Sequence, residues 1–257
     1  MNVLTNSRYS SDLPGFIEFL ETEHPEQVIR IAKEVDPDFG VSGILQKLED
    51  DGKFPLVIFE NIKGSDIPLV GNMHADFERL RLSLGMEEGD IKAFVNEYAA
   101  REANPIAPVM ADSAPVQDVV HLGDDIDVSK LPLCKYHELD AGKYITAGLG
   151  VMRDLETGIN NIGIYRHMLH GKNLLGVQFS ETSHGHYIWS QYEKRGLPCP
   201  IAIVIGHHPA FFLGSLSFTP LDADELHIAG GVLQRPVQLV PCKTIPLDVP
   251  ADAEIII

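Results

Sequence analysis

The sequence predicts an α+β fold, with an N-terminal α/β domain over residues 1–110 and a β-rich domain over residues 111–257. Helix and strand patterns alternate in the first part, and short strand-like runs dominate the second. The Pro- and Ala-rich segment NPIAPVMADSAP, at 104–115, suits a connector between them. A chain of 257 residues with 44% apolar composition can also bury two moderate cores.

The first domain opens with a capped helix, because Asp12 stands just before Pro14 and the run GFIEFLETE. Runs of β-branched and aromatic residues predict strands, and apolar residues at helical spacing predict helices. The strands are expected over 27–35 and 55–61, and the helices over 41–51, 74–85 and 91–98.

In the second domain, Gly, Pro and Asp separate short apolar runs at intervals typical of a sheet or barrel. The runs lie at 119–122, 144–152, 162–169, 174–180, 201–206 and 237–242. The turn HGKN at 170–173 predicts a β-hairpin. A single helix is expected, over 187–196.

Composition limits the function classes. The 20 Lys and Arg against 37 Asp and Glu give a formal charge of -17, which disfavours nucleic acid and anionic membranes as partners. No apolar run reaches the roughly 18 residues of a membrane span, and the chain start lacks the pattern of a signal peptide. We therefore expect a cytoplasmic protein. Three widely spaced cysteines, Cys134, Cys199 and Cys242, suggest neither disulfides nor a thiolate zinc site.

The most informative stretch is 159–186, which places polar side chains in what looks like one β-hairpin. Asn161, His184 and the more distant Glu225 offer an amide oxygen, an imidazole nitrogen and a carboxylate. Such a mixed set suits Mn²⁺ or Mg²⁺ and leaves coordination positions for a phosphate. In the alternative interpretation, Asn161 caps a turn, His184 and His186 line an exposed loop, and Glu225 is a solvated acid.

Arg166 falls in the middle of an apolar strand pattern, so it needs a partner, either a phosphate or carboxylate of a ligand or a structural salt bridge. Side chains alternate along a strand, and Asn161 and Arg166 have opposite parity. For both to reach one ligand, Asn161 must lie at the strand entrance or beside a bulge. Motifs of the common hydrolases, nucleotide-binding proteins and zinc proteases are missing from the sequence.

Several separated segments, in this order, resemble the UbiD family of prenylated-flavin-dependent decarboxylases over essentially the whole chain. They are FPLVIFENIKG, LPLCKYHELDAGKYITAG, NIGIYRHMLHGKN, PCPIAIVIGHHPA and the stretch from ELHIAGG to DAEI. The resemblance implies that residues 111–257 form a split β-barrel that binds FMN, and that a C-terminal domain is missing.

The resemblance also implies a set of ligands. Asn161, His184 and Glu225 match family residues that hold Mn²⁺ (or Mg²⁺), which clamps the phosphate of prenylated FMN. The loop GSLSF around Ser215 resembles the family loop whose backbone carbonyl groups bind K⁺. The residues matching the cofactor-binding segments are Asn161, Ile162, Gly163, Ile164, Tyr165, Arg166, Gln178, Phe179, Ser180, Ser183, His184 and Glu225.

Arg166 matches a catalytic family Arg that works with a Glu network and binds the substrate carboxylate. The implied activity is the reversible, non-oxidative decarboxylation of an aromatic or α,β-unsaturated carboxylic acid by a carboxy-lyase. In the family the proton-donating acid comes after the point where this sequence stops. We therefore expect a cofactor-binding half, from an enzyme that is a homo-oligomer when complete.

Two alternatives remain open at this point. One is a flavin reductase or electron-transfer barrel that binds ordinary FMN, with a nicotinamide site and no metal. The other is a non-catalytic subunit of a multi-protein carboxylase, which binds a partner chain through the strand near Ile257.

Overall fold

The computed structural model describes residues 12–257. The first residues, on which the prediction about a signal peptide depends, lie outside this part. Helices α1 (Leu13–Glu23), α2 (Gly40–Asp50), α3 (Phe77–Ser83) and α4 (Ile91–Glu102) confirm the helices expected in the first domain. The Asp12 carboxylate accepts a hydrogen bond from the Gly15 N–H at 3.0 Å, as predicted for a helix cap.

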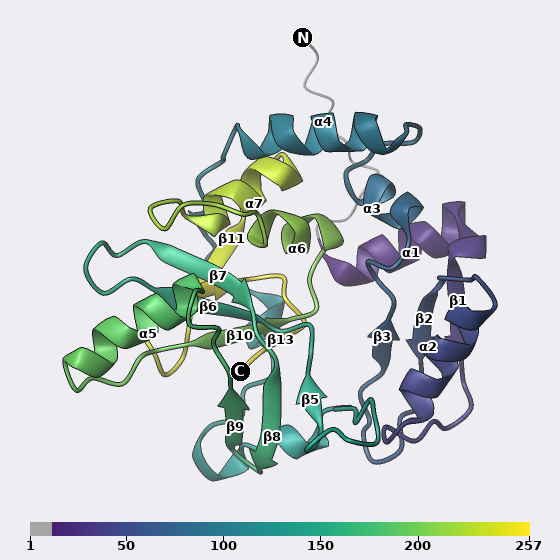
Figure 1. The fold of residues 1–257 in the computed structure, drawn as a ribbon, viewed down its shortest axis with the longest axis horizontal. Helices are drawn as coiled ribbons and strands as arrows, with labels where there is room; N and C mark the ends of the chain where they lie inside the picture. Colours follow the sequence, from purple (N-terminus) through teal and green to yellow (C-terminus); the bar gives the residue numbers. More distant parts are fainter. Residues whose placement is uncertain (1–11) are drawn as a thin grey trace.

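The predicted strands of the first domain are also confirmed, in a three-stranded sheet ordered β1-β2-β3 (Figure 1). The strands are β1 (Val28–Ile31), β2 (Leu56–Phe59) and β3 (Leu69–Gly71). Strand β2 is buried on both faces, because Leu56 and Ile58 pack with α1 and α3 while Val57 and Phe59 pack with α2.

The second half of the chain builds three small sheets. The four-stranded sheet has the order β13-β10-β6-β7, and the two three-stranded sheets are β12-β11-β4 and β5-β8-β9. No closed barrel occurs among residues 12–257. The strands are β4 (Val109–Met110), β5 (Tyr144–Ile145), β6 (Leu149–Arg153), β7 (Asn160–Ile164), β8 (His167–Gly171), β9 (Leu174–Val177), β10 (Ala202–Ile205), β11 (Gln238–Pro241), β12 (Asp248–Pro250) and β13 (Ile255–Ile256).

Three helices, rather than the predicted single one, belong to this half: α5 (His184–Lys194), α6 (Pro209–Ser215) and α7 (Glu225–Leu233). Only α5 was expected. Helices α6 and α7 are short, and α7 is buried almost all round, so they show no amphipathic period. A Cβ on Gly230 would lie 2.4 Å from the Ile106 carbonyl oxygen, so glycine lets α7 pack directly against the chain that follows α4.

The prediction of one hairpin over 159–186 is wrong. The chain leaves the four-stranded sheet after Ile164 and enters the β5-β8-β9 sheet at His167, so β7 and β8 belong to different sheets. The turn at 170–173 does join β8 to β9 as predicted, with a register shift between Leu169 and Gly171. At its other end β7 begins at Asn160, so Asn161 lies at the strand entrance, one of the two placements considered in the sequence analysis.

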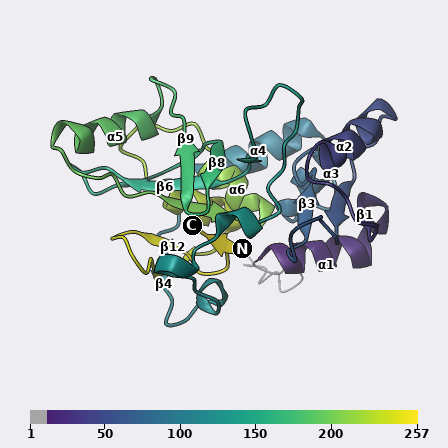
Figure 2. The same cartoon turned by 90° about the horizontal axis from the view of Figure 1, so that it is seen from below.

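Two further differences concern the connector and its surroundings. The run at 119–122 forms no strand, and β4 inside the predicted connector pairs in parallel with β11. The residue 110 boundary itself stays a prediction. Figures 1 and 2 place α2 and α5 at opposite ends of the long axis, with α4, α6 and α7 between them in Figure 1.

Two global features of the described residues concern the cysteines and the length of the helices. Cys134, Cys199 and Cys242 are free thiols. Within residues 12–257, every helix is too short or too polar to cross a bilayer.

Candidate metal centre

The start of helix α7 meets the start of strand β7 at a buried acid–amide contact. Asn161 is 6% exposed and Glu225 is 2% exposed. The Asn161 Nδ2 atom donates to Glu225 Oε1 at 2.9 Å. The backbone N–H of Ile162 donates to the other carboxylate oxygen at 3.1 Å, and the Thr219 hydroxyl donates to Oε1 at 3.2 Å. Three donors therefore fix the orientation of this carboxylate.

Glu225 is the first residue of α7, where the helix dipole favours a negative charge. Burial nevertheless raises the pKa of its carboxyl group to about 7, while the hydrogen bonds from Ile162, Thr219 and Asn161 act in the opposite direction. A buried carboxylate that is costly to ionise alone gains most from a cation that replaces its proton.

His184 completes the group. It is the first residue of α5, whose cap is the Ser183 hydroxyl, the acceptor of the His186 N–H at 3.2 Å. The His184 Nδ1 atom lies 3.5 Å from Asn161 Nδ2. His184 and His186 therefore begin a helix, and the alternative that they line an exposed loop is wrong. Asn161, His184 and Glu225, called the clamp below, come together from β7, α5 and α7.

The clamp has the properties of a site for a hard divalent cation. Among the described residues, the buried Asn161 Oδ1 atom has no hydrogen-bond partner. A rotation of the Asn161 amide by half a turn would bring this oxygen to the side of His184 and Glu225, the arrangement that a shared cation requires. An amide oxygen, an imidazole nitrogen and a carboxylate fit Mn²⁺ or Mg²⁺.

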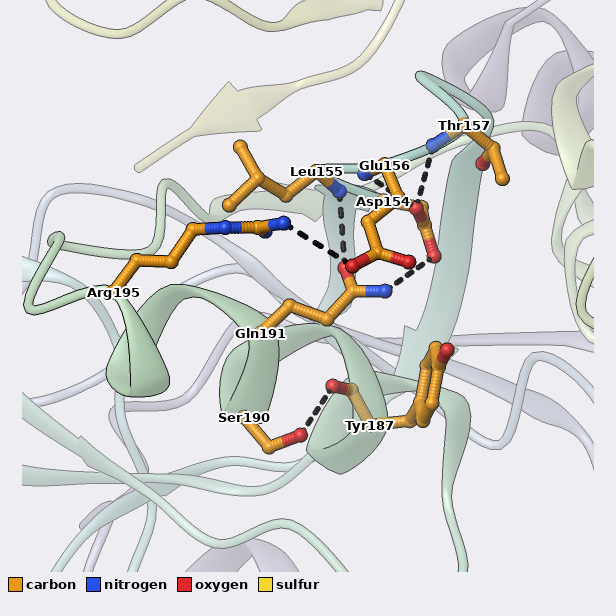
Figure 3. Close-up of polar contacts among 8 residues, drawn as sticks. All are labelled: Asp154, Leu155, Glu156, Thr157, Tyr187, Ser190, Gln191 and Arg195. Carbon is orange, nitrogen blue, oxygen red and sulfur yellow. Dashed lines mark hydrogen bonds and ion pairs between the residues drawn. The ribbon is translucent and has the colours of Figure 1, made fainter.

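A buried acid–amide pair holds α5 against the β6–β7 turn (Figure 3). The Asp154 carboxylate accepts from the N–H groups of Glu156 and Thr157, both at 2.8 Å, and from Gln191 Nε2 at 3.1 Å. The Gln191 side-chain oxygen accepts in turn from the Leu155 N–H at 3.1 Å. Because α5 carries His184 and the turn leads into β7, this network fixes two of the three elements that form the clamp.

Tyr165 packs in the space between β6, β7 and α5. A Cβ atom added at Gly185 would lie 2.2 Å from the Tyr165 hydroxyl oxygen, and one added at Gly163 would lie 2.4 Å from the same oxygen. A Cβ atom added at Gly150 would lie 2.8 Å from the Tyr165 ring. The ring also meets Phe179 edge-on, with centroids 4.8 Å apart. Three glycines thus allow the close approach that brings His184 to Asn161.

The remaining residues assigned to cofactor binding extend away from the clamp in two segments. Ile162, Gly163 and Ile164 follow Asn161 along β7. Gln178, Phe179 and Ser180 lie in the loop before α5, where the Ser180 carbonyl accepts from the Ser183 hydroxyl at 2.7 Å. Arg166 Nη2 joins the segments by donating to Gln178 Oε1 at 2.9 Å.

The prediction that Arg166 lies in the middle of an apolar strand is wrong. It lies between β7 and β8 and is exposed, rather than buried in the middle of a strand, because the chain changes sheet there. Its guanidinium carbon lies 5.9 Å from the centre of the Tyr144 ring. An exposed guanidinium needs no structural partner and can meet a ligand from solvent.

A pocket and the segment at Ser215 are two further features of this half of the chain. A cavity of about 420 Å³ is lined by Met152, Val177, Gln178, Phe179, His186, Trp189, Cys199 and Ile201. Ser215, expected in a loop that seats K⁺, is instead the last residue of α6 and is fully buried. That local expectation is wrong, and K⁺ binding itself stays a prediction.

Three residues of the site were not expected from the sequence: Thr219, Asn160 and Asp224. Asn160 Nδ2 donates to Asp224 Oδ2 at 2.9 Å, directly beside the Asn161–Glu225 contact. The only signal in the sequence is adjacency, since Asn160 precedes Asn161 and Asp224 precedes Glu225.

Two family models match the chain. One, the N-terminal domain of 3-octaprenyl-4-hydroxybenzoate carboxy-lyase, covers residues 19–97, and the other, the Rift-related domain of the same enzyme, covers residues 108–257. Both matched models describe domains of a carboxy-lyase, and together they cover most of the chain. More specifically, the chain belongs to the UbiD family.

Relatives of known sequence agree. An uncharacterised protein of Synechocystis, sll0936, is 32% identical over 267 residues, covering 96% of this chain and 53% of that protein. Anhydromevalonate phosphate decarboxylase of Methanothermobacter thermautotrophicus is 33% identical over 236 residues, covering 90% of this chain and 52% of the enzyme. The chain thus spans about half the length of these relatives.

Solved structures share the fold. The UbiD-class enzyme HmfF of Pelotomaculum thermopropionicum, in an evolved dimeric form in complex with prFMN, superposes with a TM-score of 0.88 at 34% identity, covering 96% of this chain and 56% of that one. The closed form of vanillic acid decarboxylase from Sedimentibacter hydroxybenzoicus has a TM-score of 0.91 at 28% identity, covering 97% and 54%.

Proposed function

We propose that this chain is the cofactor-binding half of a prenylated-FMN-dependent decarboxylase, which acts reversibly and without oxidation on an aromatic or α,β-unsaturated carboxylic acid. The observation that carries the proposal is the convergence of His184 and Glu225 on the side-chain amide of Asn161, whose buried oxygen has no partner among the described residues. The clamp would hold Mn²⁺ (or Mg²⁺) against the phosphate of the cofactor.

In this proposal residues 1–110 are the N-terminal α/β domain and residues 111–257 the split-barrel domain. Ile164, which is 44% exposed, and the exposed Arg166 follow the clamp along the chain and would face the flavin ring. When bound, prenylated FMN supplies an electron sink for the loss of CO₂. The proposal is supported by the neighbour HmfF, whose structures are complexes with prFMN and with FMN.

Arg166 has the role of holding the substrate carboxylate. The exposed guanidinium can form two parallel hydrogen bonds to a carboxylate. The Gln178 side-chain oxygen accepts from Arg166 Nη2 at 2.9 Å and would keep the guanidinium oriented while no substrate is bound. The proton that replaces CO₂ would come from an acid in the part of the relatives' length that residues 1–257 do not span.

The test is direct identification of what the purified protein carries. Absorbance spectra, mass spectrometry of the released ligand and metal analysis should show a prenylated flavin together with a stoichiometric divalent cation. Ordinary FMN without a metal, and with oxidation of a nicotinamide, would instead favour the flavin reductase. A copurifying chain without flavin would favour the non-catalytic subunit.

A further inference from the structure

We propose that Asn160 and Asp224 are positioning residues, which hold Glu225 in the orientation that the clamp requires. This inference rests on the proposed function, because it assigns to the two residues a role in cation binding. Neither residue belongs to the clamp. Each is the chain neighbour of a clamp residue, and together they form a second contact between β7 and α7.

Asp224 has two functions at the start of α7, one for each carboxylate oxygen. Its Oδ1 atom caps the helix by accepting from the Leu226 N–H at 2.9 Å. Its Oδ2 atom accepts from Asn160 Nδ2 at 2.9 Å and faces the Asn160 N–H at 3.4 Å. The same side chain therefore determines where the helix begins and which residue of β7 it meets.

The direction of the hydrogen bonds is fixed by Arg153. An arginine side chain can only donate, and Arg153 Nε donates to Asn160 Oδ1 at 3.0 Å. The Asn160 amide nitrogen must therefore face Asp224. Arg153 is itself held by Asp248, with Nη2 and Oδ2 3.1 Å apart, so β12 supports the chain of contacts that ends at α7.

Strand order explains why this contact controls Glu225. β7 is the edge strand of its sheet, so its outward N–H groups lack a neighbouring strand. The N–H groups of residues 160 and 162 face the consecutive carboxylates of Asp224 and Glu225. Loss of the first contact would let the first turn of α7 move away from β7, and the second carboxylate would lose its fixed place.

The experiment replaces each partner of the Asn160–Asp224 contact in turn. Asp224→Ser keeps a helix-capping oxygen but cannot also reach Asn160, and Asn160→Ala leaves the cap intact. MnCl₂ is titrated into the full 257-residue chain, and free Mn²⁺ is followed by its electron paramagnetic resonance signal. Hydrogen exchange of the Ile162 amide, which donates to Glu225, is measured without metal.

We expect each variant to weaken Mn²⁺ binding by about 10–100-fold, as the loss of outer-shell partners of metal ligands does. Hydrogen exchange at the Ile162 amide should accelerate. The loss of Mn²⁺ binding free energy in the double variant should be smaller than the sum of the losses in the two single variants. Glu60→Gln, which alters an exposed acid paired with Arg30 beside the β1-β2-β3 sheet, is the matched control and should change neither measurement. Thermal melting checks that the variants fold. If Asp224→Ser does not fold, the test relies on Asn160→Ala alone.

Wild-type Mn²⁺ affinity in both variants would overturn the inference. If the wild-type chain binds no Mn²⁺, the proposed function fails, and Ile162 exchange then decides the positioning role by itself. Faster exchange in both variants would support that role, and unchanged exchange would overturn it.

Discussion

The side chains of Asn161 and Glu225 lie 2.9 Å apart although the residues are 64 positions apart in the chain. The contact joins the start of a strand to the start of a helix, two places where backbone N–H groups lack partners within their own element. The Glu225 carboxylate satisfies one of these groups, on Ile162, and offers its other oxygen to the Asn161 amide. Helix α7 is already capped by Asp224, so capping does not explain why the Glu225 carboxyl group is buried. Its burial is consistent with a role in binding a ligand.

Glu225→Gln should remove the divalent cation and the flavin together. The substitution keeps the shape of the side chain but removes the negative charge that faces the cation. The loss of metal affinity should exceed the roughly 10–100-fold typical of outer-shell changes. Metal analysis and the flavin absorbance of purified protein provide the measurement, with Glu60→Gln as the control. Full retention of both ligands would exclude Glu225 from the clamp.

Arg166→Ala should abolish decarboxylation in a full-length enzyme that contains this chain, while leaving the fold intact. Because Arg166 is exposed, we expect the free energy of unfolding to change by no more than about 0.5 kcal/mol. Steady-state kinetics and urea denaturation measure the two effects. Arg195→Ala, which removes another exposed arginine, should keep wild-type turnover. Equal turnover in both variants would remove Arg166 from the mechanism.

His208→Asn should flatten the acid side of the stability profile. Burial lowers the pKa of His208 from 6.5 to about 3, and its Nδ1 atom caps α6 by accepting from the Ala210 N–H at 3.2 Å. Between these pKa values the unfolded chain binds the proton and the folded chain does not. Stability from this group is therefore present above pH 6.5 and is lost as the pH falls toward 3, by up to about 1.4 kcal/mol per pH unit.

Asparagine retains a capping oxygen but does not titrate, so the slope that His208 contributes should disappear. Urea denaturation at a series of pH values measures it. His137→Asn, at an exposed side chain, serves as the control. A variant at His208 with the wild-type slope would show that this imidazole is not held neutral in the fold.

Gly185→Ala should destabilise the fold, because the new Cβ would lie 2.2 Å from the Tyr165 hydroxyl oxygen. Overpacking of this kind costs about 1–3 kcal/mol. Gly43→Ala is the matched substitution, in the interior of α2 with open space around it, and should stabilise the chain by roughly 0.5–1 kcal/mol. Chemical denaturation compares them, and equal stability of the two variants would contradict the packing around Tyr165.

Local signals in the sequence were sufficient for much of the fold. Asp12 before Pro14 located the first helix, and the apolar spacing of 74–85 and 91–98 located α3 and α4, because capping and periodicity act within a few residues. The residues of the clamp were suggested by their side-chain chemistry, and the resemblance to the UbiD family matched the same residues to metal ligands. Spacing along the chain left both the metal site and its alternative open.

Tertiary structure decided the rest. The apolar pattern at 162–169 reads as one strand, yet the chain changes sheet between Ile164 and His167, because pairing partners far along the chain determine where a strand ends. Helices α6 and α7 are short and largely buried, so packing rather than amphipathic period stabilises them. Burial of Glu225 beside Asn161 depends on that packing, and so local sequence could suggest these residues but could not bring them together.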